Sequence, residues 1–299
     1  MEFPLGKCLF HYTTREAAFA HILPFHQLRM PSLEQMRDPL ENKTWFLGGA
    51  GWVAQTSRNE PVKATELAHL QFNMLANEIR KRARLLALTV DADGYSPLAS
   101  EFSRGWARPR MWENYGENHQ GICLVFDADQ LVQAIVASLR AQELLSPYHR
   151  PVEYTETGAH DLTLDLTGAS GQISAQFVAD YIERHHVELF FRKALDWQTE
   201  YEYRFVVTVP EGWGEVFVDW TGALKAVVVG ERFPGWQRPA AHAACEHAAV
   251  PVKRLDWTMG RPVLAELPRE GATNDDLDHL MTALDEAAIP PKQPPPADT

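Results

Sequence analysis

Apolar positions follow two different spacings along the chain, and the two spacings predict both strands and helices. Short, nearly continuous apolar runs at 7–12, 84–90 and 121–126 are typical of buried strands. The last third of the chain adds further strand-like runs between turn residues, at 201–209, 215–220, 223–230, 250–255 and 262–267. We therefore expect an α+β fold with a largely antiparallel sheet and packed helices.

Helical spacing of apolar residues predicts longer helices over 62–84, 129–145 and 174–196. A shorter helix has a clear start, because Thr13 and Glu16 have the spacing of a capping box, in which the hydroxyl accepts a hydrogen bond from an early helix N–H. This helix is predicted to end near Pro24. His11 is therefore expected at the end of a strand, beside the start of a helix.

Residues 1–289 contain no internal repeat and no clear linker, which favours one elaborated α+β domain. Two domains that divide near residue 150 are the alternative. The final segment, 290–299, is rich in proline and is predicted to be a disordered tail, because proline lacks the N–H that regular pairing needs.

Composition and charge narrow the class of protein. The chain is 45% hydrophobic and 23% charged, as in soluble globular proteins. Its formal charge of −12 opposes non-specific binding to nucleic acid or anionic lipid, although it permits a local basic groove. We find no signal peptide and no apolar run of membrane-spanning length, so we expect a cytoplasmic protein without membrane partners. The three distant cysteines favour a reducing compartment.

Two carboxylates and a guanidinium occupy alternate positions at the start of the strand predicted over 201–209. Strand alternation places Glu200, Glu202 and Arg204 on one face. Neighbouring carboxylates can raise each other's pKa and divide acid and base roles, whereas the arginine favours ionisation. The alternative, which is more common for such a pattern, is a solvated strand face with a surface ion pair.

Aromatic residues and a histidine gather before the predicted strand at 121–126. Trp112, Tyr115 and His119 have near-helical spacing, which would bring them to one face. His119 could then act as a general acid or base beside an aromatic wall for ring stacking. Alternatively, the aromatic rings fill the core and His119 bonds a backbone carbonyl. No ligand spacing predicts a metal site.

Taken in order, these segments resemble the bacterial domain-of-unknown-function 2971 family, over residues 9–233. The resemblance depends on the order of several patterns, which include a Val-x-Tyr strand at 152–154 and a Val-x-x-Gly turn at 227–230 besides four others. The four others are a His-Tyr-Thr strand end at His11, Tyr12 and Thr13, an Asp-Pro-x-Glu element at 38–41, a Met-Trp-x-x-Tyr-x-x-x-His pattern from Met111, and a Trp-x-x-Glu-x-Glu-Tyr-Arg pattern ending at Arg204.

More loosely, the start of the chain is similar to the first strand of ADP-ribosyltransferase-type folds. That resemblance implies that a strand-end histidine holds the ribose of NAD, that an aromatic residue stacks on nicotinamide, and that a late glutamate directs the transfer. The residues so implied are Glu202, Glu200 and His119 for catalysis, and His11, Tyr12, Thr13, Trp112, Tyr115 and Arg204 for NAD binding.

The second resemblance implies a metal-independent ADP-ribosyltransferase or NAD glycohydrolase, with a stress, toxin or phage-defence role by analogy. Its partner would be a small-molecule nucleotide, and the acceptor, protein or nucleic acid, stays open. One alternative is a metal-dependent nucleic-acid-processing enzyme built on His11, His119 and the carboxylates, with a basic groove near Arg104, Arg108 and Arg110. The other is a non-catalytic ligand-binding or interaction module.

Overall fold

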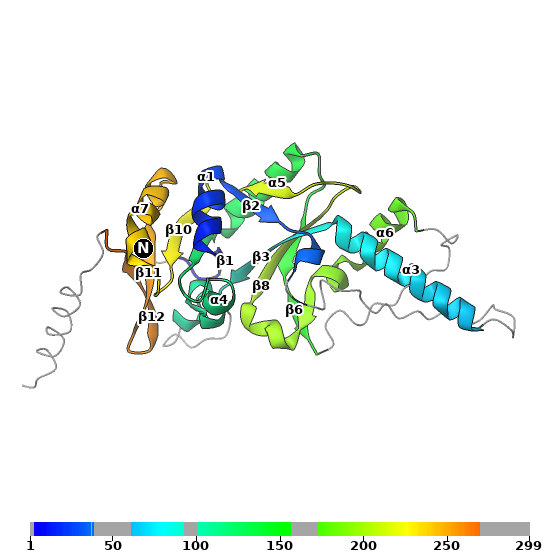
Figure 1. The fold of residues 1–299 in the computed structure, drawn as a ribbon, viewed down its shortest axis with the longest axis horizontal. Helices are drawn as coiled ribbons and strands as arrows, with labels where there is room; N and C mark the ends of the chain where they lie inside the picture. The colour runs from blue at the N-terminus through cyan, green and yellow to red at the C-terminus, as the bar shows by residue number, and fades with distance from the viewer. Residues whose placement is uncertain (1–2, 37, 39–60, 93–100, 157–172, 270–299) are drawn as a thin grey trace, which may run out of the picture.

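A large sheet organises the protein. The structure, a computed structural model, describes residues 3–36, 38, 61–92, 101–156 and 173–269 (Figure 1). Eight strands form one sheet in the order β12-β11-β10-β4-β1-β3-β8-β5. Neighbouring strands are antiparallel except β10 and β11, which are parallel. The mixture of this sheet with packed helices confirms the α+β class.

The strands of the large sheet come from most of the described chain. They are β1 (Cys8–Thr13), β3 (Ala83–Val90), β4 (Ile122–Asp127), β5 (Tyr148–Pro151), β8 (Glu202–Thr208), β10 (Leu224–Val229), β11 (Val252–Thr258) and β12 (Arg261–Glu266). Two small sheets join β2 (Gln27–Met30) to β9 (Val216–Asp219) and β6 (Glu153–Thr155) to β7 (Arg192–Ala194). Because β4 pairs with β10 and β3 with β8, segments from both sides of residue 150 share one sheet. The predicted tail, 290–299, lies outside the described residues.

The helices pack on the faces and at one end of the sheet. They are α1 (Leu23–Phe25), α3 (Pro61–Arg82), α4 (Pro109–Asn114), α5 (Ala128–Ala141), α6 (Ala175–Phe190) and α7 (Arg238–His247). A π-helical turn, η1 (Ala17–Ile22), precedes α1, and short 3₁₀ segments are η2 (Leu33–Gln35), η4 (Gly105–Ala107), η5 (Leu195–Glu200) and η6 (Gly235–Gln237). Among the helices of the described ranges, none combines the length and the apolar character that a membrane crossing requires.

Some expected elements differ from the observed ones. The first helix is capped by Thr14, whose Oγ1 accepts a hydrogen bond from the N–H of Ala17 at 3.2 Å. The predicted cap, Thr13, instead continues β1 and pairs with Ile122 of β4. The helix expected over 174–196 ends at Phe190, because the chain turns into β7. The last third of the chain, for which we predicted strands and turns, also contains the helix α7.

Apolar side chains pack on both faces of the sheet. One face carries the largest cluster, in which Leu124 and Phe205 of the strands pack with Ile135 of α5. The other face carries two clusters, one around the buried Trp112 beside α4 and one between α3 and α6 around Tyr181. Space is left between these two clusters, and the candidate site lies there.

Candidate functional site

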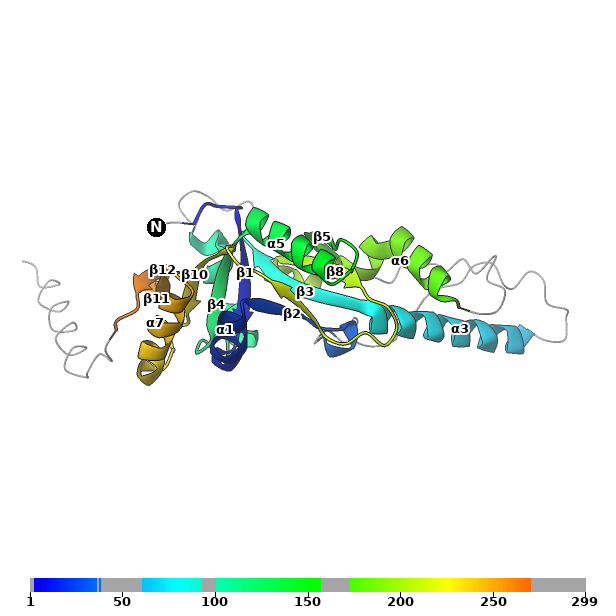
Figure 2. The ribbon, with the colours of Figure 1, turned by 90° about the horizontal axis from the view of Figure 1, so that it is seen from above.

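The large sheet opens between β1 and β3. These strands pair at two positions, Leu9 with Val90 and Phe10 with Thr89, and then diverge (Figure 2). A cavity of about 210 Å³, here called the inner cavity, occupies the opening. Its walls include His11 and Tyr12 of β1, residues 85–89 of β3, Arg29 and Pro31 from the β2 segment, and Tyr115, Lys193, Glu200 and Glu202.

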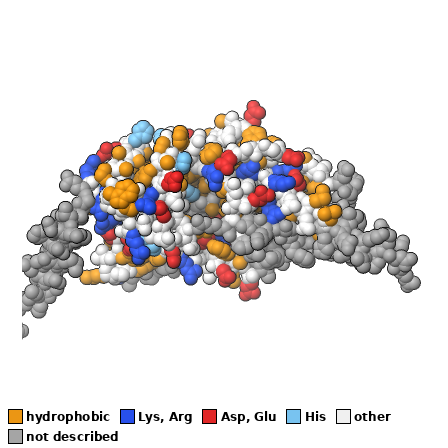
Figure 3. All heavy atoms as spheres, viewed as in Figure 1, with side chains coloured by type: hydrophobic (Ala, Val, Ile, Leu, Met, Phe, Trp, Pro, Cys, Tyr) orange, Lys and Arg blue, Asp and Glu red, His pale blue; other side chains and the backbone are white. Residues whose placement is uncertain are grey.

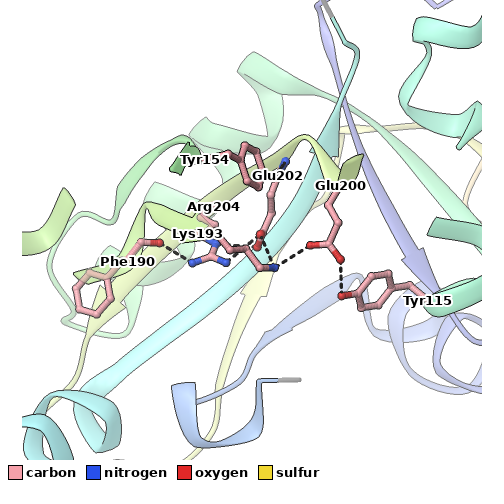
Figure 4. A network of polar contacts seen from close by, with 7 residues as sticks. All are labelled: Tyr115, Tyr154, Phe190, Lys193, Glu200, Glu202 and Arg204. Atoms are coloured by element: carbon pink, nitrogen blue, oxygen red, sulfur yellow. Dashed lines mark hydrogen bonds and ion pairs between the residues drawn. The ribbon is translucent and has the colours of Figure 1, made fainter. Parts of the chain in front are cut away.

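Four charged side chains form a network in one wall of the inner cavity (Figure 4). The Nζ of Lys193 donates to Oε2 of Glu200 at 2.8 Å and to Oε2 of Glu202 at 3.2 Å. Arg204 donates to both oxygens of Glu202, from Nε at 2.7 Å and from Nη2 at 2.9 Å. The two positive and two negative formal charges cancel, which lowers the free-energy cost of burying the network.

Backbone and aromatic groups hold this network in place. The Nη1 of Arg204 donates to the Phe190 carbonyl at 2.7 Å, so the guanidinium is fixed from its far side. The Nζ of Lys193 lies 4.5 Å from the centre of the Trp197 ring, a cation–π distance. The backbone N–H of Glu202 donates to the Tyr154 hydroxyl at 2.9 Å. These contacts preorganise the charged wall.

The charged wall is buried, contrary to the surface ion pair that is common for such sequences. Glu200 is 6% exposed, Glu202 5% and Arg204 1%. Burial by itself raises the pKa of Glu202, but the cations of Arg204 and Lys193 outweigh it and hold that pKa below its ordinary value. Glu202 is therefore ionised at neutral pH, so it can stabilise positive charge but cannot donate a proton.

Tyr115 faces the charged wall from the end of α4. Its hydroxyl donates to Oε1 of Glu200 at 2.8 Å. Burial, reinforced by the Glu200 carboxylate, raises the pKa of Tyr115 well above its usual range. The hydroxyl consequently stays protonated and remains a hydrogen-bond donor at the mouth of the inner cavity.

His11 is a neutral group in the opposite wall. Burial lowers its pKa from 6.5 to about 4, and a hydrogen bond to the backbone of Ala87 opposes this shift only in part. At neutral pH the imidazole carries no charge. It can therefore contact an uncharged polar group of a ligand.

Some lining residues carried no recognisable signal in the sequence. Thr89 lies opposite Glu202 in the β3–β8 ladder, and its buried Oγ1 has no hydrogen-bond partner among the described residues. Buried hydroxyls in proteins are normally satisfied, so a ligand or a water is expected there. Asp38, from the Asp-Pro-x-Glu element, also lines the inner cavity, whereas residues 39–41 lie outside the described chain.

The structure brings several predicted site residues together and separates others. His11, Tyr12, Tyr115, Glu200 and Glu202 line the inner cavity. Arg204 stands behind Glu202. Thr13 lines an adjoining groove. Lys193, which connects the two carboxylates, was not among the predicted site residues, although it precedes the Trp-x-x-Glu pattern.

Trp112 is part of the core and not of a cavity wall. It is fully buried, and its indole N–H donates to the carbonyl of Trp106 at 2.8 Å. The Tyr12 ring packs edge-to-face against it, with ring centres 5.0 Å apart, and donates its hydroxyl to the Gly105 carbonyl at 2.6 Å. Stacking of a ligand on Trp112 is therefore blocked by this packing.

The His119 ring stacks near Trp112, as expected, with ring centres 6.5 Å apart, but the chain between the two residues is not a continuous helix. The helix α4 ends at Asn114, and Glu117, Asn118 and His119 all have left-handed backbone angles, with φ of 51°, 52° and 68°. The Nδ1 of His119 lies 3.8 Å from Oε1 of Glu231, and the residue lines neither the inner cavity nor the adjoining groove. The predicted convergence of His119 with Glu202 is not observed.

Two of the three arginines proposed for a basic groove, Arg104 and Arg108, are engaged within the protein, whereas Arg110 is exposed. Arg108 donates to the Val90 carbonyl at 3.1 Å and lies 3.9 Å from the centre of the Tyr201 ring. The Nε of Arg104 lies 3.2 Å from Oδ1 of Asp91. On the face shown in Figure 3, basic and acidic side chains are interspersed. In the part of the chain that the structure describes, no three His, Cys, Asp or Glu side chains are grouped to hold a metal ion.

Comparison with known proteins identifies a family over the centre of the chain. Residues 111–205 match the family described as "Protein of unknown function (DUF2971)". Over these residues the match confirms the first resemblance drawn from the sequence, and the matched segment includes Tyr115, Lys193, Glu200, Glu202 and Arg204. No curated protein and no solved structure matches the chain.

Proposed function

We propose that the inner cavity is the active site of an enzyme that cleaves the bond between nicotinamide and ribose in NAD and transfers ADP-ribose to an acceptor or to water. The observation that carries the proposal is the pair of carboxylates that Lys193 and Arg204 hold in a buried cavity wall. Cleavage of a glycosidic bond develops positive charge on the sugar ring. A fixed carboxylate in a site of low dielectric constant stabilises that charge strongly.

The leaving group also suits this wall. When the bond breaks, its electron pair passes to the pyridinium nitrogen, and nicotinamide leaves as a neutral molecule. The reaction therefore needs no acid to protonate the leaving group. A carboxylate with a lowered pKa, such as that of Glu202, belongs to a site that stabilises charge and does not donate protons.

We assign the contact with the sugar to Glu200. Both oxygens of Glu202 are bound by Arg204, and one of them also by Lys193. Glu200 has one oxygen on Lys193 and the other on the Tyr115 hydroxyl, which comes from a different segment and can be exchanged for a substrate hydroxyl. Glu202 is then a positioning residue, because it holds Lys193 against Glu200.

Nicotinamide release by purified protein tests the proposal, with a chelator present to exclude a metal-dependent reaction. Glu200→Gln keeps the shape of the side chain and removes its charge, and it should lower kcat at least about 100-fold, the usual loss on removing one charge-stabilising group. Glu211→Gln, an exposed carboxylate outside the cavity, is the matched control. Full activity of a folded Glu200→Gln protein would remove Glu200 from catalysis, and no turnover by the wild type would refute the proposal.

A non-catalytic nucleotide-binding module is the second candidate. The charged groups of the wall are all paired with one another. A fully satisfied polar network of this kind also rigidifies a pocket that binds a ligand without catalysing a reaction. NAD binding that survives Glu200→Gln and Glu202→Gln, without nicotinamide release by the wild type, would support this module and exclude the enzyme.

A further inference from the structure

A second, wider hollow continues from the inner cavity. This hollow is the adjoining groove described above and is here called the outer groove. It has a volume of about 730 Å³ and shares five lining residues with the inner cavity. The shared residues are His11, Tyr12, Arg29, Pro31 and Tyr115. At about 210 Å³, the inner cavity is smaller than the roughly 300–1,000 Å³ of most small-molecule sites. A ligand of ordinary size would therefore extend from the inner cavity into the outer groove.

The backbone that forms one wall of the outer groove is unusual. Ala17, His21 and Ile22 of the π-helical turn η1 line the groove. Such turns are rare and occur frequently at functional sites, because the extra residue redirects side chains. The next element, α1, ends at Phe25, and the residue that follows, His26, has a left-handed φ of 54°. The unusual backbone of η1 and His26 is an observation independent of the charged wall, and it lies beside the same two compartments.

Two exposed aromatic rings also line the outer groove. Phe25 of α1 is 65% exposed, and Phe217 of β9 is 41% exposed. Phenylalanine is usually buried, so two exposed rings in one groove are notable. Their faces offer stacking surfaces for a planar ring such as a nucleobase.

Arg29 lies where the two compartments meet. It pairs with Glu215 at 3.2 Å, and both side chains are about half exposed, at 50% and 49%. An exposed pair of this kind contributes little to stability, so a ligand anion can replace the carboxylate. A guanidinium binds two phosphate oxygens at once, which makes it well suited to a phosphate group.

The geometry points to a two-compartment dinucleotide site. The outer groove binds the adenosine half by stacking the base on Phe25 and Phe217, Arg29 binds the pyrophosphate, and the inner cavity receives the nicotinamide and its ribose. The inference rests on the proposed function, since it takes the same cavity as the ligand site. Beyond the proposed function, it assigns each half of the substrate to one of the two compartments.

Calorimetric titration of the full chain with AMP, nicotinamide mononucleotide and NAD tests this division. Phe217→Ala should weaken AMP and NAD binding at least fivefold, as expected for loss of one stacking contact. It should leave the binding of nicotinamide mononucleotide unchanged. Arg29→Gln should weaken all three ligands, because each carries phosphate. Trp236→Ala, which removes another exposed ring outside both compartments, and Arg269→Gln, at another exposed ion pair, are the matched controls.

Glu215→Gln separates a ligand contact from a merely structural ion pair. If the phosphate replaces Glu215 on Arg29, removing the competing carboxylate should tighten AMP binding about two- to fivefold. If the pair serves only to fix β2 to the β9 segment, AMP binding should not improve, which would count against the role of Arg29.

The possible failures are distinguishable. AMP binding that depends on Phe217 and Arg29, without nicotinamide release from NAD, would uphold the two compartments and overturn the proposed reaction. Nicotinamide release together with unchanged AMP and NAD affinities in Phe217→Ala and Arg29→Gln would overturn the two compartments and uphold the reaction. Absence of both AMP and NAD binding would overturn both.

Discussion

The inner cavity and the turn formed by residues 117–119 begin from similar sequence signals and differ in structure. Each has a histidine, a glutamate and aromatic rings, which are neighbours in the sequence at the turn and come from distant segments in the inner cavity. In the inner cavity, Glu200 and Glu202 are held by two cations beside open space. In the turn, His119 packs near Glu231 and lines no cavity of the site.

The difference lies in the backbone and not in the residue types. Divergence of β1 from β3 leaves room for a ligand between two strands. At the turn, glycines let backbone segments approach closely, and a Cβ built on Gly230 would lie 2.1 Å from the carbonyl oxygen of His119. Chemically capable side chains become a candidate site only where the packing also leaves space for a ligand.

The variant with the largest expected effect disrupts the charged wall. Arg204→Met would leave the buried Glu202 with Lys193 alone, and we expect a loss of about 3–5 kcal/mol in the free energy of unfolding, measured by urea denaturation. Arg269→Met, which breaks an exposed pair with Glu246, should cost less than about 1 kcal/mol. A similarly small loss for both variants would show that the wall is not a dry, buried network.

The next effect concerns His11 and pH. Its pKa is lower in the folded protein, about 4, than its ordinary value of 6.5, so the unfolded chain takes up the proton first. Its contribution to stability is complete above pH 6.5 and is lost as the pH falls toward 4, by about 3 kcal/mol in all. Urea midpoints measured across this range should reveal the loss.

His11→Gln should flatten this pH dependence. Burial also lowers the pKa of His149, so His149→Gln serves as the comparison with a smaller effect. Glu202 contributes in the same direction but at lower pH, because its depressed pKa makes its stabilisation disappear as the pH falls below its ordinary value of 4.5. An unchanged slope between pH 6.5 and 4 in His11→Gln would contradict a neutral imidazole with a lowered pKa.

A smaller effect tests the close packing at the turn. Gly230→Ala would force a methyl group against the His119 backbone, and we expect a loss of about 2 kcal/mol from overpacking. Gly214→Ala is the matched control, since a Cβ there meets no atom within 4 Å, and it should change stability by less than about 0.5 kcal/mol. Equal stability of the two variants in thermal unfolding would mean that the turn has room to move.

The smallest effect concerns the residue that connects the two regions. Tyr115→Phe removes the hydroxyl that donates to Glu200, and a loss of about 1.5 kcal/mol is typical for a hydrogen bond to a charged group. Tyr148→Phe, whose hydroxyl makes no hydrogen bond among the described residues, should be nearly neutral. Chemical denaturation of both variants checks this, and an equal response would argue against the contact with Glu200.

Local periodicity explains which sequence predictions were accurate. Glu202 and Arg204 lie two residues apart in β8, so strand alternation correctly places them on one face. Glu200 joins them from the preceding η5 segment, because Tyr201 has a left-handed φ of 46° that turns the chain into the strand. The early termination of α4 at Asn114, and with it the position of His119, had no comparable signal in the spacing of side chains.

The sequence by itself determined the strands of the large sheet other than β5, the α+β class, the family resemblance and the residue types of the charged wall, because these depend on spacing and composition over a few neighbouring residues. Only the tertiary structure decided that β1 and β3 separate, that Thr89 faces Glu202, and that Lys193 bridges the two carboxylates. These features depend on pairing between residues that are distant in the sequence, and neither hydrophobic nor charge patterns specify such a register.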